Sequence, residues 1–280
     1  MYQPFQANSE LPRVSDPDVL INSEWPKLDG ATAAYPVFAA VAQSIYKGMN
    51  LENVSEYVNC SNTIGAYERL NAGEIDIFFG AQPSNSQLQD AISAGIQYEM
   101  TALGHEAFVF FVHKDNPINN LSLEQIRDIY TKRVTNWSDL GGNFEQIIAY
   151  QRNADSGSQT IMQSKVMNKE PMAEPLRDEQ INFMGRIVDD VAEYRNGTAA
   201  IGYSFRFYVT GMKKTEDVKL LAIDGIEPSK ENIRNGSYPL TIEFFAITAG
   251  NKNPNVSELL IWLQAEQGQQ LIEDCGYVGL

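Results

Sequence analysis

The chain has 280 residues, of which 43% are hydrophobic and 20% are charged, so it can bury a sizeable core in one or two compact units. No apolar run approaches the roughly 20 residues that span a bilayer, and the first 18 residues lack the basic-then-apolar pattern of a signal peptide. A formal net charge of −15 argues against nucleic-acid binding and means that any anion site must rely on local donors.

Strand-like and helix-like segments alternate along the first half of the chain, which predicts an α/β fold. Residues 1–24 carry three prolines and are expected to form an irregular lead-in. The expected elements are then a helix capped by Thr32 with Pro36 in its first turn, a strand at 53–60, a turn and helix at 61–75, a short buried strand at 76–83, and an apolar strand at 106–113.

The second half continues the alternation. The expected elements are a helix that opens with a capping box, Ser122 and Gln125, and stops at a double glycine, 141–142, then a strand at 146–152, a helix, turn and strand at 189–205, a strand at 239–248, and one amphipathic helix at 256–276. Two strands that flank a long middle section indicate a two-lobed protein. The expected boundaries give lobe 1 residues 25–103 and 243–280, and lobe 2 residues 104–242.

Cysteine and histidine are too scarce for a metal centre. Cys60 and Cys275 lie far apart in sequence, and two buried free thiols are expected, with one disulfide as the alternative. His113 closes a strand and is expected to be structural, while His105 lies at the presumed crossover between lobes. No metal ion or cofactor is predicted, because no zinc, phosphate-loop or dinucleotide motif is present.

The segment from Tyr150 to Val166, YQRNADSGSQTIMQSKV, places an arginine ahead of a small hydroxyl turn that opens a helix. Three interpretations are open: Ser156 or Ser158 only caps the helix, one of them is a nucleophile, or the turn binds an anion. An anion site would use the helix N–H groups, the two hydroxyls, the close backbone approach allowed by Gly157, and the planar guanidinium of Arg152.

The same pattern recurs at two turns upstream. Gly30-Ala31-Thr32-Ala33 and Ser61-Asn62-Thr63-Ile64-Gly65 each place small residues and a hydroxyl ahead of a helix. Strand-to-helix turns of open α/β sheets commonly meet where ligands bind, so three such turns favour a shared site.

At these residues the sequence resembles the phosphate-binding proteins of bacterial ABC transporters, a branch of the type II periplasmic binding protein fold. The resemblance covers residues 27–280 and rests on the segments DGATAAYP, GEIDIFFGAQPS, VHKDNPINNLSLEQIRDIYTKRVTNWSDLGG, QRNADSGSQ and AAIGYSF. It implies two lobes, each a mixed sheet flanked by helices, with ligand in the cleft between the lobes. It implies ligand contacts by Arg152, Ser156, Gly157, Ser158, Thr32, the N–H of Ala33, and Thr63, with Ser61 as the alternative to Thr63.

One position departs from the family pattern. Where the family carries an aspartate that accepts the proton of a hydrogen-bearing phosphate, this chain has Ala81 and Gln82. A carboxylate favours protonated anions, whereas a glutamine keeps an acceptor without the charge. Gln82 is therefore the expected selectivity position, and sulfate or another oxyanion stays open beside phosphate.

The predicted function is capture of inorganic phosphate, or a related tetrahedral oxyanion, by a monomeric extracytoplasmic protein that delivers it to an ABC transporter permease. The resemblance implies an export signal or surface anchor outside the given sequence. The predicted action is binding without turnover. The alternatives are a sensor or adhesin domain of the same fold, and a serine-dependent hydrolase, which would need His105 or His113 as its base.

Overall fold

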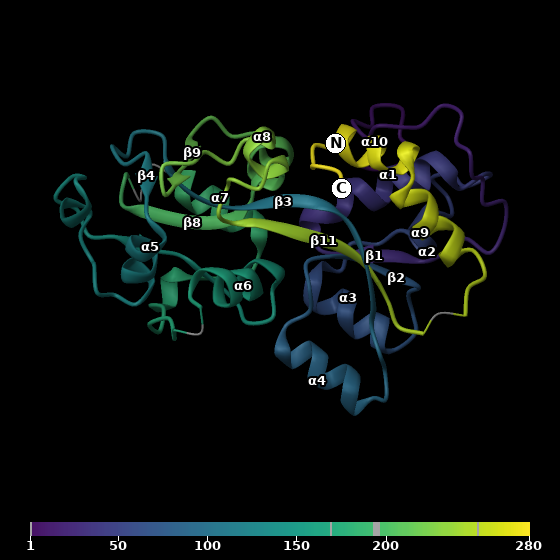
Figure 1. The fold of residues 1–280 in the computed structure, drawn as a ribbon, viewed down its shortest axis with the longest axis horizontal. Helices are drawn as coiled ribbons and strands as arrows, with labels where there is room; N and C mark the ends of the chain where they lie inside the picture. The colour runs from purple at the N-terminus through teal and green to yellow at the C-terminus, as the bar shows by residue number, and fades with distance from the viewer. Residues whose placement is uncertain (1, 169, 193–196, 251) are drawn as a thin grey trace. The chain divides into compact units, whose positions relative to one another are not determined.

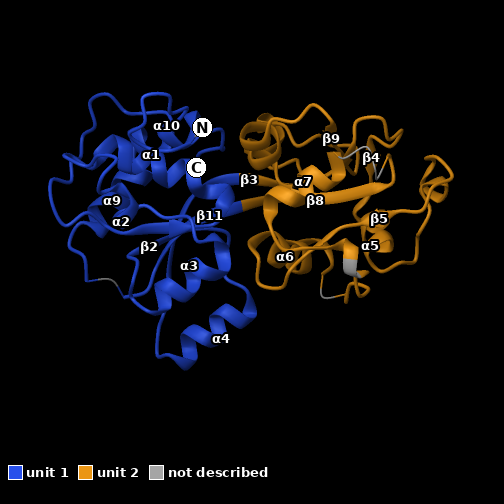
Figure 2. Cartoon of the chain, turned by 180° about the vertical axis from the view of Figure 1, so that it is seen from behind, with its two compact units in different colours: residues 1–105, 243–280 blue, residues 106–242 orange. Residues whose placement is uncertain are grey.

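The computed structural model describes residues 2–168, 170–192, 197–250 and 252–280 (Figure 1). The chain forms two compact units, Met1–His105 with Glu243–Leu280, and Glu106–Ile242 (Figure 2). The units divide at residues 105/106 and 242/243, whereas the lobe boundaries expected from the sequence are 103/104 and 242/243. Within the described residues, no helix combines the length and apolar character needed to cross a membrane.

Unit 1 contains a mixed sheet with helices on both faces, as the sequence predicts. Its elements are β1 (Leu28–Gly30), η1 (Thr32–Ala34), α1 (Tyr35–Ile45), α2 (Val54–Tyr57), α3 (Asn62–Asn71), β2 (Ile77–Gly80), α4 (Asn85–Ser93), the start of β3 (Glu99–His113), the end of β11 (Thr241–Thr248), α9 (Val256–Gln264) and α10 (Glu266–Asp274). Strand β2 pairs parallel with β1 and antiparallel with β11.

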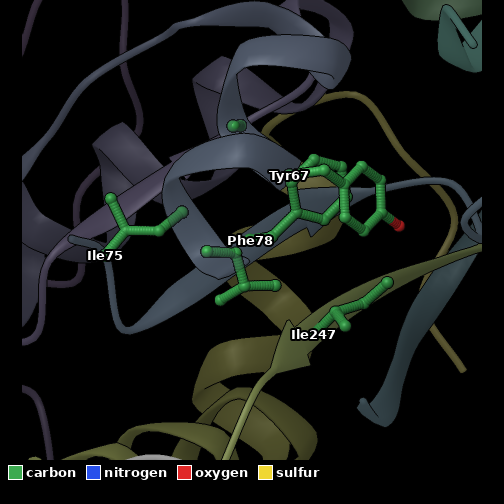
Figure 3. Close-up of a cluster of buried hydrophobic side chains, with 6 residues drawn as sticks. Tyr67, Ile75, Phe78 and Ile247 are labelled. Atoms are coloured by element: carbon green, nitrogen blue, oxygen red, sulfur yellow. The ribbon is translucent and has the colours of Figure 1, made fainter. Parts of the chain in front are cut away.

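Neighbouring phenylalanines of β2 show how the two faces of this sheet are covered. Side chains alternate along a strand, so Phe78 and Phe79 point to opposite faces. The Phe78 ring stacks on Tyr67 of α3, with 4.1 Å between ring centroids, and both belong to a buried cluster with Ile247 of β11 (Figure 3). Phe79 packs against Phe38 of α1 at 5.3 Å. Helices α3 and α1 therefore cover opposite faces of the sheet.

The lead-in has neither helix nor strand over residues 2–24, as expected, yet it is held against unit 1 by hydrogen bonds. The N–H of Val14 donates to the Ser44 hydroxyl of α1, and the N–H of Asp18 donates to the Gln267 side chain of α10. Ile21 and Tyr46 form an isolated parallel bridge. The segment thus packs along the helical face of the unit.

Unit 2 is also built on a mixed sheet. Its elements are the remainder of β3, β4 (Asn120–Leu121), α5 (Leu123–Tyr130), η2 (Trp137–Leu140), β5 (Ile148–Ala149), β6 (Gln151–Arg152), α6 (Gly157–Ile161), the π-helix η3 (Met162–Val166), η4 (Arg177–Glu179), β7 (Gln180–Ile181), α7 (Met184–Ala192), β8 (Ala200–Phe205), the π-helix η6 (Tyr208–Lys213), β9 (Val218–Leu220), β10 (Ala222–Ile223) and α8 (Lys230–Arg234). Strand β3 pairs antiparallel with β8 and β9, and β8 pairs parallel with β5.

The buried strand β8 again separates two layers. Tyr203 packs against Tyr130 of α5 with 5.6 Å between ring centroids, so α5 covers that face. Gly202, on the opposite face, leaves room for Val191 of α7, whose methyl carbon would lie 3.1 Å from a Cβ placed there. The parallel pairs β4–β10 and β6–β7 each form a separate two-stranded sheet.

Several expected elements differ in detail. The strand expected at 53–60 is the short helix α2 followed by an isolated bridge from Val58 to Leu28. Thr32 does not cap α1; it begins the 3-10 turn η1, and Pro36 lies in the first turn of α1 as predicted. The helix expected to run from the Ser122 capping box to the double glycine ends at Tyr130, and the separate turn η2 ends at Leu140, directly before Gly141.

The remaining differences concern the predicted extents. The strand expected at 146–152 is divided into β5 and β6, and β3 begins at Glu99, earlier than expected. The helix of the 189–205 segment begins at Met184, and part of its expected turn lies outside the described residues. The C-terminal helix is two helices, because Ala265 between them is extended, with ψ 171°.

Candidate anion-binding site

The segment that follows β6 is a tight turn closed by its own hydrogen bonds. Strand β6 ends at Arg152, the N–H of Ser156 donates to the carbonyl of Asn153 at 3.3 Å, and Asp155 takes the left-handed conformation with φ 61°. Ser156 caps α6, since its hydroxyl oxygen accepts the N–H of Gln159 at 3.3 Å. The capping interpretation is therefore correct for Ser156, but it accounts for only one of the polar groups here.

Arg152 carries a buried guanidinium with unused hydrogen-bond donors. The residue is 7% exposed, and neither Nε nor Nη1 has a hydrogen-bond partner among the described residues. Burial lowers the pKa of Arg152 to about 10, partly offset by Tyr203 and Tyr208, so the group remains charged at neutral pH. A buried charge without a counterion is costly, and an anion that occupies the site would remove that cost.

The hydroxyls beside Arg152 have donors to spare as well. Ser158 is 1% exposed and its Oγ has no partner among the described residues. Ser156 Oγ already accepts an N–H, so its own hydrogen can donate outward. The N–H groups of Gly157 and Ser158 belong to the first turn of α6, where no intrahelical acceptor exists. Together these groups have the chemistry of an oxyanion cradle.

Two predicted site segments of unit 1 each follow a strand of its sheet. Thr32 and Ala33 lie just beyond the end of β1, and Gln82 lies just beyond the end of the parallel strand β2. Gly30 at the end of β1 must be a glycine, because a Cβ there would collide with the carbonyl of Phe79 in the paired strand β2. The backbone of Ala33 is further held by the hydroxyl of Tyr277, which donates to its carbonyl.

Among the described residues the hydroxyl of Thr63 has no hydrogen-bond partner, whereas that of Ser61 is hydrogen-bonded. Ser61 Oγ donates to Asp29 at 2.7 Å and accepts from Arg69 at 3.2 Å. Thr63 is buried on α3, and its hydroxyl makes no hydrogen bond within the described part of the chain. Of the two alternatives left by the sequence, Thr63 is the one with a donor available for a ligand.

A model of the PBP superfamily domain matches residues 27–272 of this sequence. The chain belongs to this superfamily. The resemblance to periplasmic binding proteins expected from the sequence is confirmed, and so is the mixed α/β fold.

Named relatives match most of this PBP superfamily member, with about a quarter of the aligned residues identical. The phosphate-binding protein PstS of Staphylococcus epidermidis is 28% identical over 228 residues, covering 78% of this chain and 68% of that protein. The protein SphX of Synechococcus elongatus is 26% identical over 264 residues, covering 90% and 76%. PstS of Bacillus subtilis is 24% identical and covers 90% and 79%.

Solved structures show the same fold. A putative phosphate ABC transporter substrate-binding protein of Clostridium perfringens, with bound phosphate, has a TM-score of 0.69 at 23% identity and covers 91% of this chain and 99% of that chain. A phosphate transport receptor of Vibrio cholerae has a TM-score of 0.66 at 21% identity and covers 91% and 100%. The two PstS relatives are named as phosphate-binding proteins.

Neither histidine of this PBP superfamily domain is hydrogen-bonded to a serine among the described residues. His113 Nδ1 accepts the N–H of Asp115 at 3.3 Å, and His105 Nδ1 lies 3.4 Å from the carbonyl oxygen of Gly279. No group of three or more possible metal ligands is found among the described residues. Among the described residues Cys60 and Cys275 form no disulfide with each other, as expected, and Cys275 is buried as expected, but Cys60 is exposed, contrary to the expectation of two buried thiols.

Sequence reasoning missed residues that hold the predicted contacts in place. Asp29 is fully buried, pairs with Arg69, and accepts the N–H groups of Gly30 and Ser61 at 2.8 Å each, so it ties the Thr32 turn to the start of α3. Its signal in the sequence is an aspartate directly before the glycine of the first turn. Cys60 lies close enough to hydrogen-bond Thr32.

Proposed function

We propose that this protein captures inorganic phosphate, or a closely related tetrahedral oxyanion, outside the cytoplasm and delivers it to the permease of an ABC transporter. The observation that carries the proposal is the Arg152 guanidinium, which is buried, charged and without a partner on Nε and Nη1 among the described residues. The names of the PstS relatives support phosphate as the ligand.

The proposal assigns a role to each predicted residue. In unit 2, Arg152 supplies the positive charge, and Ser156, Gly157 and Ser158 supply hydroxyl and N–H donors. In unit 1, Thr32, the N–H of Ala33 and Thr63 supply further donors. Every one of these groups donates, so the assigned set favours an anion rich in acceptor oxygens.

Gln82 is proposed as the selectivity position. Its side chain is partly exposed and makes no hydrogen bond among the described residues. A neutral amide can accept a hydrogen bond from a protonated phosphate without repelling a fully ionised anion. Weaker discrimination between phosphate and sulfate is therefore part of the proposal.

Calorimetry on two Arg152 variants tests the site. Arg152→Ala is expected to weaken phosphate binding by about 2 kcal/mol or more, a roughly 30-fold higher Kd, because a charged hydrogen-bond partner is lost. Arg152→Met keeps an apolar stem of similar length, and in the absence of ligand it should melt at a higher temperature than the wild type, since it removes a buried unpaired charge.

The matched control is Arg186→Ala, which removes an exposed arginine of α7 that pairs with Asp190 at 3.2 Å. It should leave the Kd unchanged, because exposed ion pairs contribute little and act locally. Wild-type affinity in Arg152→Ala would reject the site assignment. Turnover of a phosphoester, abolished by Ser156→Ala or Ser158→Ala, would instead support an enzyme.

A further inference from the structure

The backbone N–H of Arg152 is held by two side chains from outside its own strand. Tyr203 Oη accepts this N–H at 2.9 Å, and Gln159 Oε1 accepts it at 3.3 Å. The Tyr203 hydroxyl in turn donates to Gln159 Oε1. Three groups from β6, α6 and β8 therefore form one closed hydrogen-bonded set around the residue that carries the unpaired charge.

Gln159 joins the two ends of the turn that begins at Arg152. Its side chain accepts from Arg152, while its backbone N–H donates to the Ser156 hydroxyl. Its Nε2 donates to the sulfur of Met172 at 3.4 Å, and the residue is 4% exposed. Because its backbone and its side chain are both hydrogen-bonded, the Gln159 side chain is restricted to one rotamer. These bonds fix the distance between Arg152 and Gln159 at the two ends of the turn.

Tyr203 is in turn fixed by its surroundings in unit 2. It is fully buried on β8, and the rings of Phe108, Phe110 and Tyr130 lie around it at centroid distances of 5.5 to 6.0 Å. Burial raises the pKa of Tyr203 above its ordinary value, so the hydroxyl keeps its proton and continues to donate to Gln159. The aromatic packing therefore fixes the position of a single hydroxyl group.

We infer that Tyr203 and Gln159 are positioning residues of the anion site. They fix the Arg152 backbone and the Ser156 turn, and thereby the donors of the guanidinium and the hydroxyls, without touching the ligand themselves. The inference rests on the proposed function. Its physical basis is that a long side chain presents its charge accurately only when its backbone is held, and that displacements of about 1 Å at such sites can cost orders of magnitude in binding or rate.

Tyr203→Phe removes only the hydroxyl and is the direct test. It should raise the Kd for inorganic phosphate about tenfold, on the scale of a modestly misplaced site, and should speed hydrogen exchange of the Arg152 amide. Tyr238→Phe is the matched control: Tyr238 is buried in the same unit, and its hydroxyl donates to the carbonyl of Phe108 at 3.0 Å. Tyr130→Phe is a second control, because the Tyr130 hydroxyl has no partner in the described residues.

The expected pattern separates positioning from general stability. Tyr203→Phe and Tyr238→Phe should each lower the melting temperature by a few degrees, roughly the effect of one lost buried hydrogen bond, yet only Tyr203→Phe should weaken phosphate binding. Tyr130→Phe should change neither quantity appreciably. Wild-type affinity in Tyr203→Phe, or an equal loss in Tyr238→Phe, would overturn the inference.

Failure of the proposed function would look different. If the wild-type protein bound no phosphate, or if Arg152→Ala bound it normally, the anion site itself would be rejected, and the positioning role with it. If Arg152→Ala lost affinity while Tyr203→Phe kept it, the site would stand and only the positioning role would fall.

Discussion

At the scale of single residues, the candidate ligand donors differ in how far their hydrogen bonds are satisfied. Arg152 and Ser158 are buried with donors that have no partner among the described residues, whereas Ser156 already accepts an N–H and Ser61 is bound to Asp29. The sequence could name all four, because each follows a recognisable turn pattern. It favoured Thr63 over Ser61 through the family pattern alone, because the contact that engages the Ser61 hydroxyl is made by Asp29, a residue 32 positions before Ser61.

The positioning residues were beyond prediction for a similar reason. Tyr203 and Arg152 are separated by 51 positions, and nothing in their local sequences indicates that one accepts the N–H of the other. Gln159 follows the Ser-Gly-Ser triplet directly, but its contact depends on the exact closure of the turn. Long-range contacts of this kind are decided by packing of β8 against α6 rather than by local pattern.

Glu106 is a buried acid outside the proposed site, and its raised pKa predicts that the free energy of unfolding depends on pH. It is 3% exposed, and burial raises its pKa to about 7, although Arg206, Lys230 and hydrogen bonds from the N–H groups of Ala107 and Phe207 oppose the shift. The folded pKa exceeds the ordinary value of 4.5. The stability that this group contributes is therefore complete below about pH 4.5 and is lost as the pH rises through about 7.

Glu106→Gln cannot titrate, so the comparison isolates this group. The free energy of unfolding of the wild type minus that of Glu106→Gln should fall as the pH rises from about 4.5 to about 7, and then level off. Chemical denaturation at several pH values measures it. Glu99→Gln, at an exposed position of the same strand, is the control. A difference that stays constant or grows over this range would show that the pKa of Glu106 is not raised in the folded protein.

At the scale of elements, the sequence predicted those with a strong period or cap and erred where two patterns compete. Val54 and Val58 fit both strand alternation and one helical turn, so the segment could not be assigned from four or five residues. Helix α4 was missed because only Gln87 and Ala91 are buried on it, which leaves no apolar stripe. Its capping box, Ser84 and Gln87, was the available signal.

The break between α9 and α10 was missed because the apolar pattern continues across it. Ala265 is extended there, and Gly268 lies against the backbone of Trp262 and Leu263. A Cβ at Gly268 would lie 2.5 Å from Cα of Leu263 and nearer still to the carbonyl oxygen of Trp262, both closer than van der Waals contact, and backbone cannot move aside as a flexible side chain can. The glycine thus permits the close crossing of the two helices.

Gly268→Ala should therefore destabilise the protein by about 2 kcal/mol, in the range of overpacked sites, despite the higher helix propensity of alanine. Urea denaturation measures the change. Gly65→Ala in α3 is the matched control: a Cβ there would meet only the Ser61 side chain, at 3.2 Å, so the loss should be smaller. Equal stability of the Gly268 variant and the wild type would contradict the close packing.

At the scale of the whole molecule, net charge and site chemistry oppose each other. A formal charge of −15 repels anions at long range, so steering cannot account for binding of phosphate. The proposed donors are local and the central one is buried, and salt screens such contacts far less than it screens exposed charges. The salt dependence of phosphate binding therefore tests the proposed site most directly.

That test is a calorimetric titration of purified wild-type protein with phosphate at low and at near-physiological salt, with sulfate titrated in parallel. One phosphate is expected to bind per chain, with an affinity that changes little between the two salt concentrations. No heat of binding, or an affinity that collapses as salt is raised, would contradict the claim that the buried Arg152 is the centre of an anion site.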